Sequence, residues 1–276
     1  MIKRWLYGVI PHVFTSVFNP ASEKLAYYDI LRKEGYSHFP YPFAKAYLEL
    51  PVEVMDDPQK GLPYVLHDGN KRLYYPREWT PERIRKNYRS LRIEQDPRHA
   101  HHYIDNRAEL RGRTLLDVGA AEGIFSLDVI EEVKAVYLFE CEKQWIEALH
   151  ATFEPWAEKV TIVQKFVGNS NDATHTTLDR FAEEQQLQSP VFLKMDIEGA
   201  ECEALIGGGF YCLSATWSLP SASITARGTH GLLPRISPNT DATTNSGKDS
   251  YTSSIACGAA SFVATITDKI PIHYEQ

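Results

Sequence analysis

Residues 115–125 have the sequence LLDVGAAEGIF, in which an apolar run ends in an acid and two glycines follow four residues apart. The apolar run predicts a buried strand, and the apolar residues from Ile124 onward recur at a spacing of three, as on a helix. Gly119 and Gly123 allow a tight turn between these elements and a close approach of the backbone to a ligand. The stretch therefore predicts a strand, a glycine loop and a helix.

The alternation of strands and helices continues to residue 207 and sets the fold class. Strands are predicted at residues 113–118, 135–140, 160–167 and 191–197. Helices are predicted around residues 124–130, 145–153, 176–185 and 200–205. This order is typical of an α/β fold, a Rossmann-like parallel sheet with helices on both faces and right-handed crossovers.

Composition divides the chain into three regions. Residues 1–108 are rich in aromatic residues, proline and arginine, and are expected to form a mainly helical region before the core at 109–207. Residues 208–276 hold only 8 charged residues, against 57 in the first 207, and are rich in serine and threonine. No strand of the core fold is recognisable in this tail, so a linker, a disordered tail and an altered reading frame stay open.

One helix of the first region is clearly marked. Thr80 is a suitable cap, Pro81 suits the first helical position, and Ile84, Tyr88 and Leu91 recur at helical spacing. The basic residues of this helix have two possible interpretations: they form an anion-binding face, or they form a face exposed to solvent.

The first 14 residues, MIKRWLYGVIPHVF, are basic and apolar. Pro11 and His12 interrupt the apolar run and no clear small-residue cleavage site follows, which favours a docking helix over a signal peptide. No stretch approaches the roughly 18 apolar residues of a membrane span. An integral span is therefore not expected, while peripheral contact with a membrane surface stays open.

Charge and cysteine content limit the functional classes. The net charge of −7 argues against nonspecific nucleic-acid binding. The four cysteines are scattered without metal-ligand spacing, which fits a reducing compartment and a cytoplasmic location. The spacing of His99, His101 and His102 does not put all three on one face, so no metal site is expected; His102 is a candidate base.

The glycine loop favours a cationic ligand. A dinucleotide site prefers the pattern G-x-G-x-x-G, which this loop lacks. Asp117 and Glu122 also lie where their negative charges would repel a pyrophosphate. S-adenosylmethionine carries a sulfonium and an ammonium and no phosphate, so these acids would attract it. Glu140 ends the second strand, where a carboxylate can accept hydrogen bonds from both ribose hydroxyls. A strand, turn and helix with ordinary surface acids is the alternative.

The stretch FLKMDIEGAE, residues 192–201, is the second cluster of charged residues. Lys194, Asp196 and Glu198 alternate, so they share one face of a strand and its extension. A lysine within a buried strand is costly unless an acid pairs with it. A purely structural ion pair is the alternative to a functional role.

Residues 117–207 resemble a class I S-adenosylmethionine-dependent methyltransferase, and more narrowly the FkbM family. DVGAAEG resembles the first motif, with Ala121 where many methyltransferases have a third glycine, and YLFE resembles the ribose-binding strand end. TLDRF followed by LKMDIEGAE resembles the FkbM signature. The resemblance implies methylation of a hydroxyl oxygen, often on a sugar, a glycan or a small metabolite.

The resemblance also implies site residues. Cofactor contacts are expected from Asp117, Gly119, Ala120, Ala121, Glu122, Gly123, Glu140, Cys141, Asn169 and Asp172. At the transfer site Asp196 is the first candidate base and Glu198 the second, with Lys194 as an ion-pair partner. Cys141 stands where the family usually has proline, which the carboxylate of Glu140 should tolerate. The rival functions are a nicotinamide-dependent oxidoreductase and a noncatalytic protein with an incomplete sheet.

Overall fold

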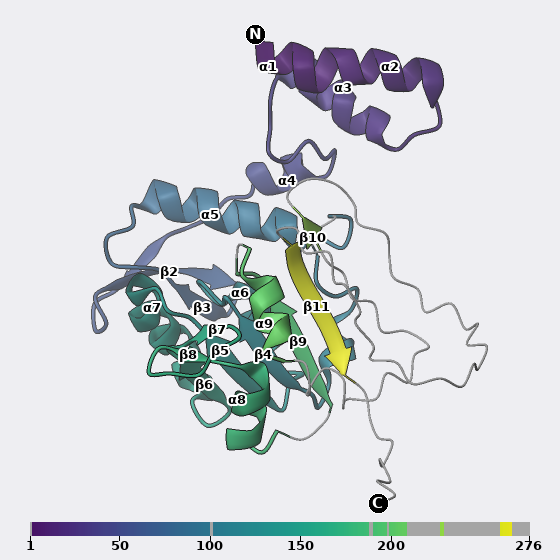
Figure 1. Ribbon diagram of the computed structural model, residues 1–276. Coiled ribbons are helices and arrows are strands. Elements are labelled where there is room, and N and C mark those ends of the chain that lie inside the picture. The colour runs from purple at the N-terminus through teal and green to yellow at the C-terminus, as the bar shows by residue number, and fades with distance from the viewer. Residues whose placement is uncertain are drawn as a thin grey trace, which may run out of the picture. The chain divides into compact units, whose positions relative to one another are not determined.

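The computed structural model describes residues 2–99, 102–187, 190–197, 199–208, 227–228 and 260–266. The chain divides into two compact units. Figure 1 labels the helices and strands of both units. The first unit comprises residues 1–56 and 78–102, and the second comprises residues 57–77 and 103–276.

The first unit is mainly helical, which confirms the fold expected for the N-terminal region. Its helices are α1 (Ile2–Arg4), α2 (Ile10–Phe18), α3 (Lys24–Glu34), α4 (Ala44–Leu48) and α5 (Pro81–Glu94), with the π-helical turn η1 (Trp5–Val9) between α1 and α2. In that turn the N–H of Ile10 donates to the carbonyl of Trp5. Pro11 follows directly and has no N–H to donate, so one regular helical hydrogen bond is missing at this point.

Helix α5 begins as its sequence predicts. The N–H of Arg83 donates to Oγ1 of Thr80 at 3.3 Å, and Ile84 is fully buried. Arg89 donates from Nε to the carbonyl of Leu50 at 2.9 Å. Arg89, on the basic face of α5, therefore binds the backbone of its own unit.

Residues 55–74 contain a small sheet that the sequence analysis did not expect. It has the strand order β1 (Met55–Asp57), β2 (Leu62–His67) and β3 (Lys71–Tyr74), and β2 and β3 are antiparallel.

The main sheet confirms the predicted Rossmann-like fold. Four strands are parallel to one another and lie in the order β9 (Val191–Met195), β4 (Thr114–Val118), β5 (Ala135–Phe139) and β6 (Val160–Val163). The stretch predicted as one strand at residues 160–167 is divided, because β7 (Phe166–Val167) leaves the sheet and pairs with β8 (His175–Thr176). The chain reverses its direction of travel across the sheet at β4, which places a crevice beyond the carboxyl ends of β4 and its neighbours.

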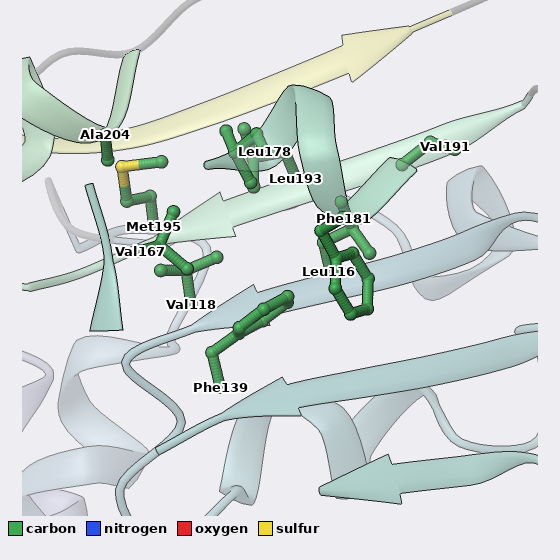
Figure 2. Packing of buried hydrophobic residues seen from close by; sticks show 10 residues of the cluster. All are labelled: Leu116, Val118, Phe139, Val167, Leu178, Phe181, Val191, Leu193, Met195 and Ala204. Atoms are coloured by element: carbon green, nitrogen blue, oxygen red, sulfur yellow. The ribbon is translucent and has the colours of Figure 1, made fainter. Parts of the chain in front are cut away.

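Helices cover both faces of this sheet. They are α6 (Ile124–Val129), α7 (Lys143–Phe153), α8 (Leu178–Glu184) and α9 (Glu201–Ile206), with the 3-10 turns η2 (Arg107–Leu110) and η3 (Glu154–Trp156). Figure 2 shows the core on the α8 face, where Leu116, Leu193 and Phe181 pack together. On the opposite face Ser126 of α6 reaches Asp117 of β4.

The tail contains two strands that the sequence analysis did not recognise. Strand β11 (Ala260–Ile266) lies antiparallel beside β9, with Phe262 opposite Met195, and β10 (Arg227–Gly228) lies antiparallel to β11 (Figure 1). The run ASFVATI contains the strand-favouring residues Phe262, Val263, Thr265 and Ile266. It was not recognised because the tail around it shows little periodicity and its pairing with β9 is nonlocal. The alternatives for the rest of the tail lie outside the described residues.

Within the described residues no helix combines the length and the apolar character needed to cross a bilayer.

Candidate functional site

A cavity of about 500 Å³ lies at the carboxyl ends of β4, β5 and β9. Its lining comes from Val118, Gly119, Ala121, Phe139, Glu140, Cys141, Glu142, Trp145, Lys165, Phe166, Val167, Gly168, His175, Asp196, Ile197, Ala200 and Glu203. This is the crevice in which open α/β sheets bind their ligands.

The glycine loop passes close to the end of β9. Gly119 has a φ of +78°, and a Cβ on this residue would lie 2.0 Å from the carbonyl oxygen of Asp196, so no other residue fits here. The N–H groups of Gly119 and Ala120 both donate to the carbonyl of Phe139, at 3.0 and 3.1 Å. Gly123, with a φ of +77°, is the residue before α6. The loop is thereby fixed to both neighbouring strands.

Ala121 is strained in this loop. Its φ is +47°, in the left-handed region that residues with a Cβ seldom adopt. Its N–H donates to Oε2 of Glu140 at 2.8 Å. The conformation costs about 1–2 kcal/mol relative to a right-handed one, and the hydrogen bond to the carboxylate holds it in place.

Glu140 presents a fixed carboxylate to the cavity. Besides the bond from Ala121, its Oε1 accepts from the N–H of Glu142 at 2.7 Å, and the residue is 9% exposed. Each carboxylate oxygen has a second acceptor position, so the group can still bind hydroxyls. Beside it, Cys141 lines the cavity as a free thiol. Burial, with a smaller effect from the charge of Glu140, raises the pKa of this thiol to about 11.

Asp117 and Lys194 form a buried ion pair behind the cavity. They are register partners on adjacent parallel strands, and Nζ of Lys194 lies 2.8 Å from Oδ1 of Asp117. Ser126 donates to Oδ2 of Asp117 at 2.6 Å, and Lys194 donates to the carbonyl of Gly119 at 2.7 Å. Burial alone would lower the pKa of Lys194, but the charges of Asp117 and Asp196 outweigh it, and the pKa is raised. The ammonium group of Lys194 therefore links Asp117 of β4 to the glycine loop through an ion pair and a hydrogen bond.

Asp196 extends from the end of β9 into the cavity lining. Its Oδ2 accepts from the hydroxyl of Tyr103 at 2.8 Å. The ring centroid of Tyr103 is 5.6 Å from Nζ of Lys194. Glu198, the second candidate base, lies outside the described residues.

Glu201 is a site residue that sequence reasoning did not single out. It is 2% exposed, and it accepts from the N–H of Ile197 at 3.1 Å and from the N–H of Gly199 at 2.8 Å. These bonds shape the turn that follows Asp196. An acid in the first turn of α9 was the available signal, because carboxylates are favoured at helix N-termini.

Around the loop that joins β7 and β8, the cavity is lined by residues other than the expected ones. Asn169 is exposed and outside the lining, and Asp172 is engaged in its own turn, accepting from the N–H of Thr174 at 2.7 Å. Hydrogen bonds from Thr174 and from His175 lower the pKa of Asp172. Phe166 and His175 line the cavity instead, with ring centroids 5.4 Å apart. The aromatic pair offers a stacking surface.

The expected site residues fall into two groups. Those that line the cavity are Gly119, Ala121, Glu140, Cys141 and Asp196. Those that the structure places outside the lining are Asp117, Ala120, Glu122, Gly123, Asn169, Asp172 and Lys194. Within the second group the Asp117 and Lys194 pair supports the loop from behind.

The ligand atoms of His67, Asp68 and Asp128 lie within 4.8 Å of one another, which is a spacing that a metal ion could bridge. The guanidinium of Arg107 forms ion pairs with both carboxylates, at 2.7 Å from Asp68. The guanidinium of Arg107 therefore supplies the positive charge that a metal ion would otherwise bring to this cluster. Of the three histidines considered earlier, His101 lies outside the described residues, and His102 bonds through Nδ1 to the carbonyl of His99.

The charged groups of the cavity lining are predominantly acidic. The carboxylates are Glu140, Glu142, Asp196 and Glu203, and the lining ammonium is Lys165. Such a surface attracts cations and repels phosphates.

Comparison with known proteins identifies the sequence family. The family model described as Methyltransferase FkbM domain matches residues 58–217, more than half of the chain. No curated protein matches the sequence. A solved structure, methyltransferase FkbM from Methylobacillus flagellatus KT, is 15% identical with a TM-score of 0.29. The match covers 46% of this chain and 39% of that protein, so the chain spans well under half of that relative's length.

Proposed function

Because the chain belongs to the FkbM methyltransferase family, we propose that it transfers a methyl group from S-adenosylmethionine to a hydroxyl oxygen of a sugar, a glycan or a small metabolite. The observation that carries the choice of donor is the cavity lining, which among the described residues holds four carboxylates and one ammonium. A donor with a sulfonium and an ammonium gains attraction from such a surface, whereas a pyrophosphate would be repelled.

The residues present fit this donor. The strand-end carboxylate of Glu140 can accept hydrogen bonds from a ribose diol, because each of its oxygens retains an acceptor position. Gly119 leaves room beside the end of β9 that a Cβ would fill. Phe166 and His175 offer ring faces for a base.

The chemistry assigned to the chain is positioning and proton removal. When bound, the donor supplies an electrophilic methyl carbon. In our proposal Asp196 would accept the proton of the acceptor hydroxyl while the oxygen of that hydroxyl forms the new bond to the methyl carbon. The bond between that carbon and the donor sulfur would break at the same time, and the donor would leave as a neutral thioether. Tyr103 holds the carboxylate of Asp196 by its hydrogen bond, so that this base meets the hydroxyl in one orientation.

The two rival functions predict different ligands. A nicotinamide-dependent oxidoreductase would have to place a pyrophosphate near Glu140 and the glycine loop, where negative charge is concentrated. A noncatalytic protein would retain the fold without binding a donor. Ligand binding therefore separates all three.

The decisive experiment is calorimetric titration of the full chain with S-adenosylmethionine and, separately, with NAD. We expect a binding isotherm for the first and none for the second. Heat with NAD alone would overturn the proposal in favour of the oxidoreductase, and no heat with either would favour the noncatalytic protein.

Turnover is tested by the substitution Asp196→Asn. The carboxamide keeps the size of the side chain but is a far weaker base, so we expect donor binding to persist while methyl transfer falls by about 10²–10⁴-fold. Transfer is measured on a pool of small metabolites and glycans by mass spectrometry, as the gain of one methylene per product. Equal transfer by both proteins would remove Asp196 from the role of base.

A further inference from the structure

The N-terminal helix of the first unit exposes a row of large apolar side chains. Helices α1 and α2 and the turn η1 run without a break from residue 2 to residue 18. The row, called here the apolar stripe, comprises Ile2, Leu6, Ile10, Val13, Phe14 and Val17. These side chains are between 49% and 76% exposed.

The side of this helix that faces α3 carries few large apolar groups. Gly8 is its buried residue, and a Cβ there would lie 2.6 Å from the backbone nitrogen of Arg32 in α3. His12 and Thr15 are half-buried, and His12 lies 3.8 Å from Asp29. A surface helix of a globular protein turns its apolar face to the core, and this helix does the opposite.

The charges beside the apolar stripe are positive. Residues 2–22 contain Lys3 and Arg4 and no acid, in a chain whose net charge is −7. Trp5 and Tyr7, 58% and 51% exposed, lie next to these cations. Aromatic side chains with one polar end favour the boundary between lipid headgroups and acyl chains. Basic residues near that boundary are attracted to anionic lipids.

We propose that the apolar stripe docks this protein on a membrane surface that contains anionic lipid. The helix is too short and too interrupted to span the bilayer, and no described helix meets the requirements for a span. It lies in the plane of the surface, with the apolar stripe among the upper acyl chains and Lys3 and Arg4 among the headgroups. This inference concerns the first unit alone and does not depend on the proposed reaction.

The test is co-sedimentation of the full chain with vesicles of phosphatidylcholine alone and of phosphatidylcholine mixed with phosphatidylserine. We expect binding to both, tighter to the mixed vesicles. The double substitution Leu6→Glu and Phe14→Glu should weaken binding by at least about tenfold, because two charges enter the apolar stripe. Lys3→Gln should weaken binding to the mixed vesicles alone, by about fivefold.

The matched control is the double substitution Leu48→Glu and Leu66→Glu, which adds the same charge at two other exposed apolar side chains. It should bind as the unaltered protein does. Equal vesicle binding by the Leu6→Glu and Phe14→Glu variant, or no binding by the unaltered protein, would overturn the proposal. An oligomer in light scattering that this variant converts to monomer, without vesicle binding, would make the apolar stripe a contact between copies of the chain and would also overturn it.

Discussion

The hydroxyl of Tyr103 donates to the carboxylate of Asp196 at 2.8 Å, although 93 positions separate the two residues in the chain. Tyr103 precedes the first strand of the main sheet, and Asp196 follows the fourth parallel one. The bond thus joins the segment that enters the sheet to the residue proposed as base. In this arrangement Tyr103 is a positioning residue.

Tyr103→Phe should lower kcat by about tenfold or more, because a hydrogen bond to a charged group is worth about 1.5–3 kcal/mol. KM for the donor should stay unchanged, since the hydroxyl contacts the base and the ring is retained. Steady-state kinetics on methyl transfer measure both constants. A rise in KM with kcat unaltered would assign Tyr103 to ligand binding instead.

Loss of the ion pair between Asp117 and Lys194 should mainly lower the stability of the folded protein. Asp117→Asn leaves a buried ammonium without its counter-charge and should reduce the free energy of unfolding by about 3–5 kcal/mol. The double substitution Asp117→Leu with Lys194→Met should recover most of that loss, because no charge is then buried. Urea unfolding at neutral pH measures all three proteins. Weaker donor binding without loss of stability in Asp117→Asn would instead give Asp117 a direct ligand role.

The same pair predicts a dependence on alkaline pH. The pKa of Lys194 is raised above its usual value of 10.5 in the folded state. The pair's contribution is therefore fully present below that usual value and is lost as pH rises through the folded pKa. In this range the unaltered protein should lose stability more steeply than the double variant that carries Asp117→Leu and Lys194→Met. Urea unfolding at successive pH values measures the difference.

Ala121→Gly should stabilise the protein. Glycine relieves the cost of a left-handed conformation, about 1–2 kcal/mol, and loses part of this gain through the greater freedom of the unfolded chain. We expect a net gain of about 0.5–1 kcal/mol in the free energy of unfolding. Ala120→Gly is the matched control, because Ala120 has no positive φ, and it should destabilise. Equal effects of the two substitutions would show that Ala121 is not strained.

Glu140→Gln should weaken binding of S-adenosylmethionine by about 10–100-fold, because charge-assisted hydrogen bonds to the ribose become neutral ones. Glu142→Gln removes the same charge from the same cavity lining but not from the strand end. It should weaken binding by much less. Calorimetric titration compares the two, and equal losses would mean that only the overall charge of the cavity matters.

Cys141 should react slowly with iodoacetamide at mildly alkaline pH. A pKa of about 11, against the usual 9.0, reduces the thiolate fraction about a hundredfold. The greater nucleophilicity of a more basic thiolate recovers part of this, leaving a reaction about tenfold slower than that of a free cysteine. Peptide mapping by mass spectrometry measures the rate at Cys141. Bound donor should slow it further, because Cys141 lines the cavity.

Local sequence patterns predicted the strands and helices of the core, because each of these elements depends mainly on residues that are close together in the sequence. The apolar run before Gly119 predicted a buried strand, and the capping pattern of Thr80 and Pro81 predicted the start of α5. Strands β5 and β9 were predicted for the same reason, since apolar runs of this length bounded by polar residues favour buried parallel strands. The position of Glu140 at a strand end was likewise predicted from its place in the sequence.

Nonlocal pairing is what the local patterns missed. Strand β11 joins the sheet by lying beside β9, which is distant in the sequence. Its strand-favouring residues were overlooked because the tail around them shows little periodicity. The hairpin of β2 and β3 is local, by contrast, and its Asp68–Gly69 turn was a sequence signal that the analysis overlooked.

The sequence by itself determined the order of strands and helices, the glycine loop and the acids near it, because each depends on neighbours within a few residues. Only the tertiary structure decided which of these acids line the cavity. Register between β4 and β9 puts Lys194 against Asp117 and neutralises that acid behind the cavity. Glu140 and Asp196, which follow the ends of β5 and β9, are left to line the cavity. The physical reason is that a buried charge must find its partner across the sheet, and a linear pattern does not show which strands become neighbours.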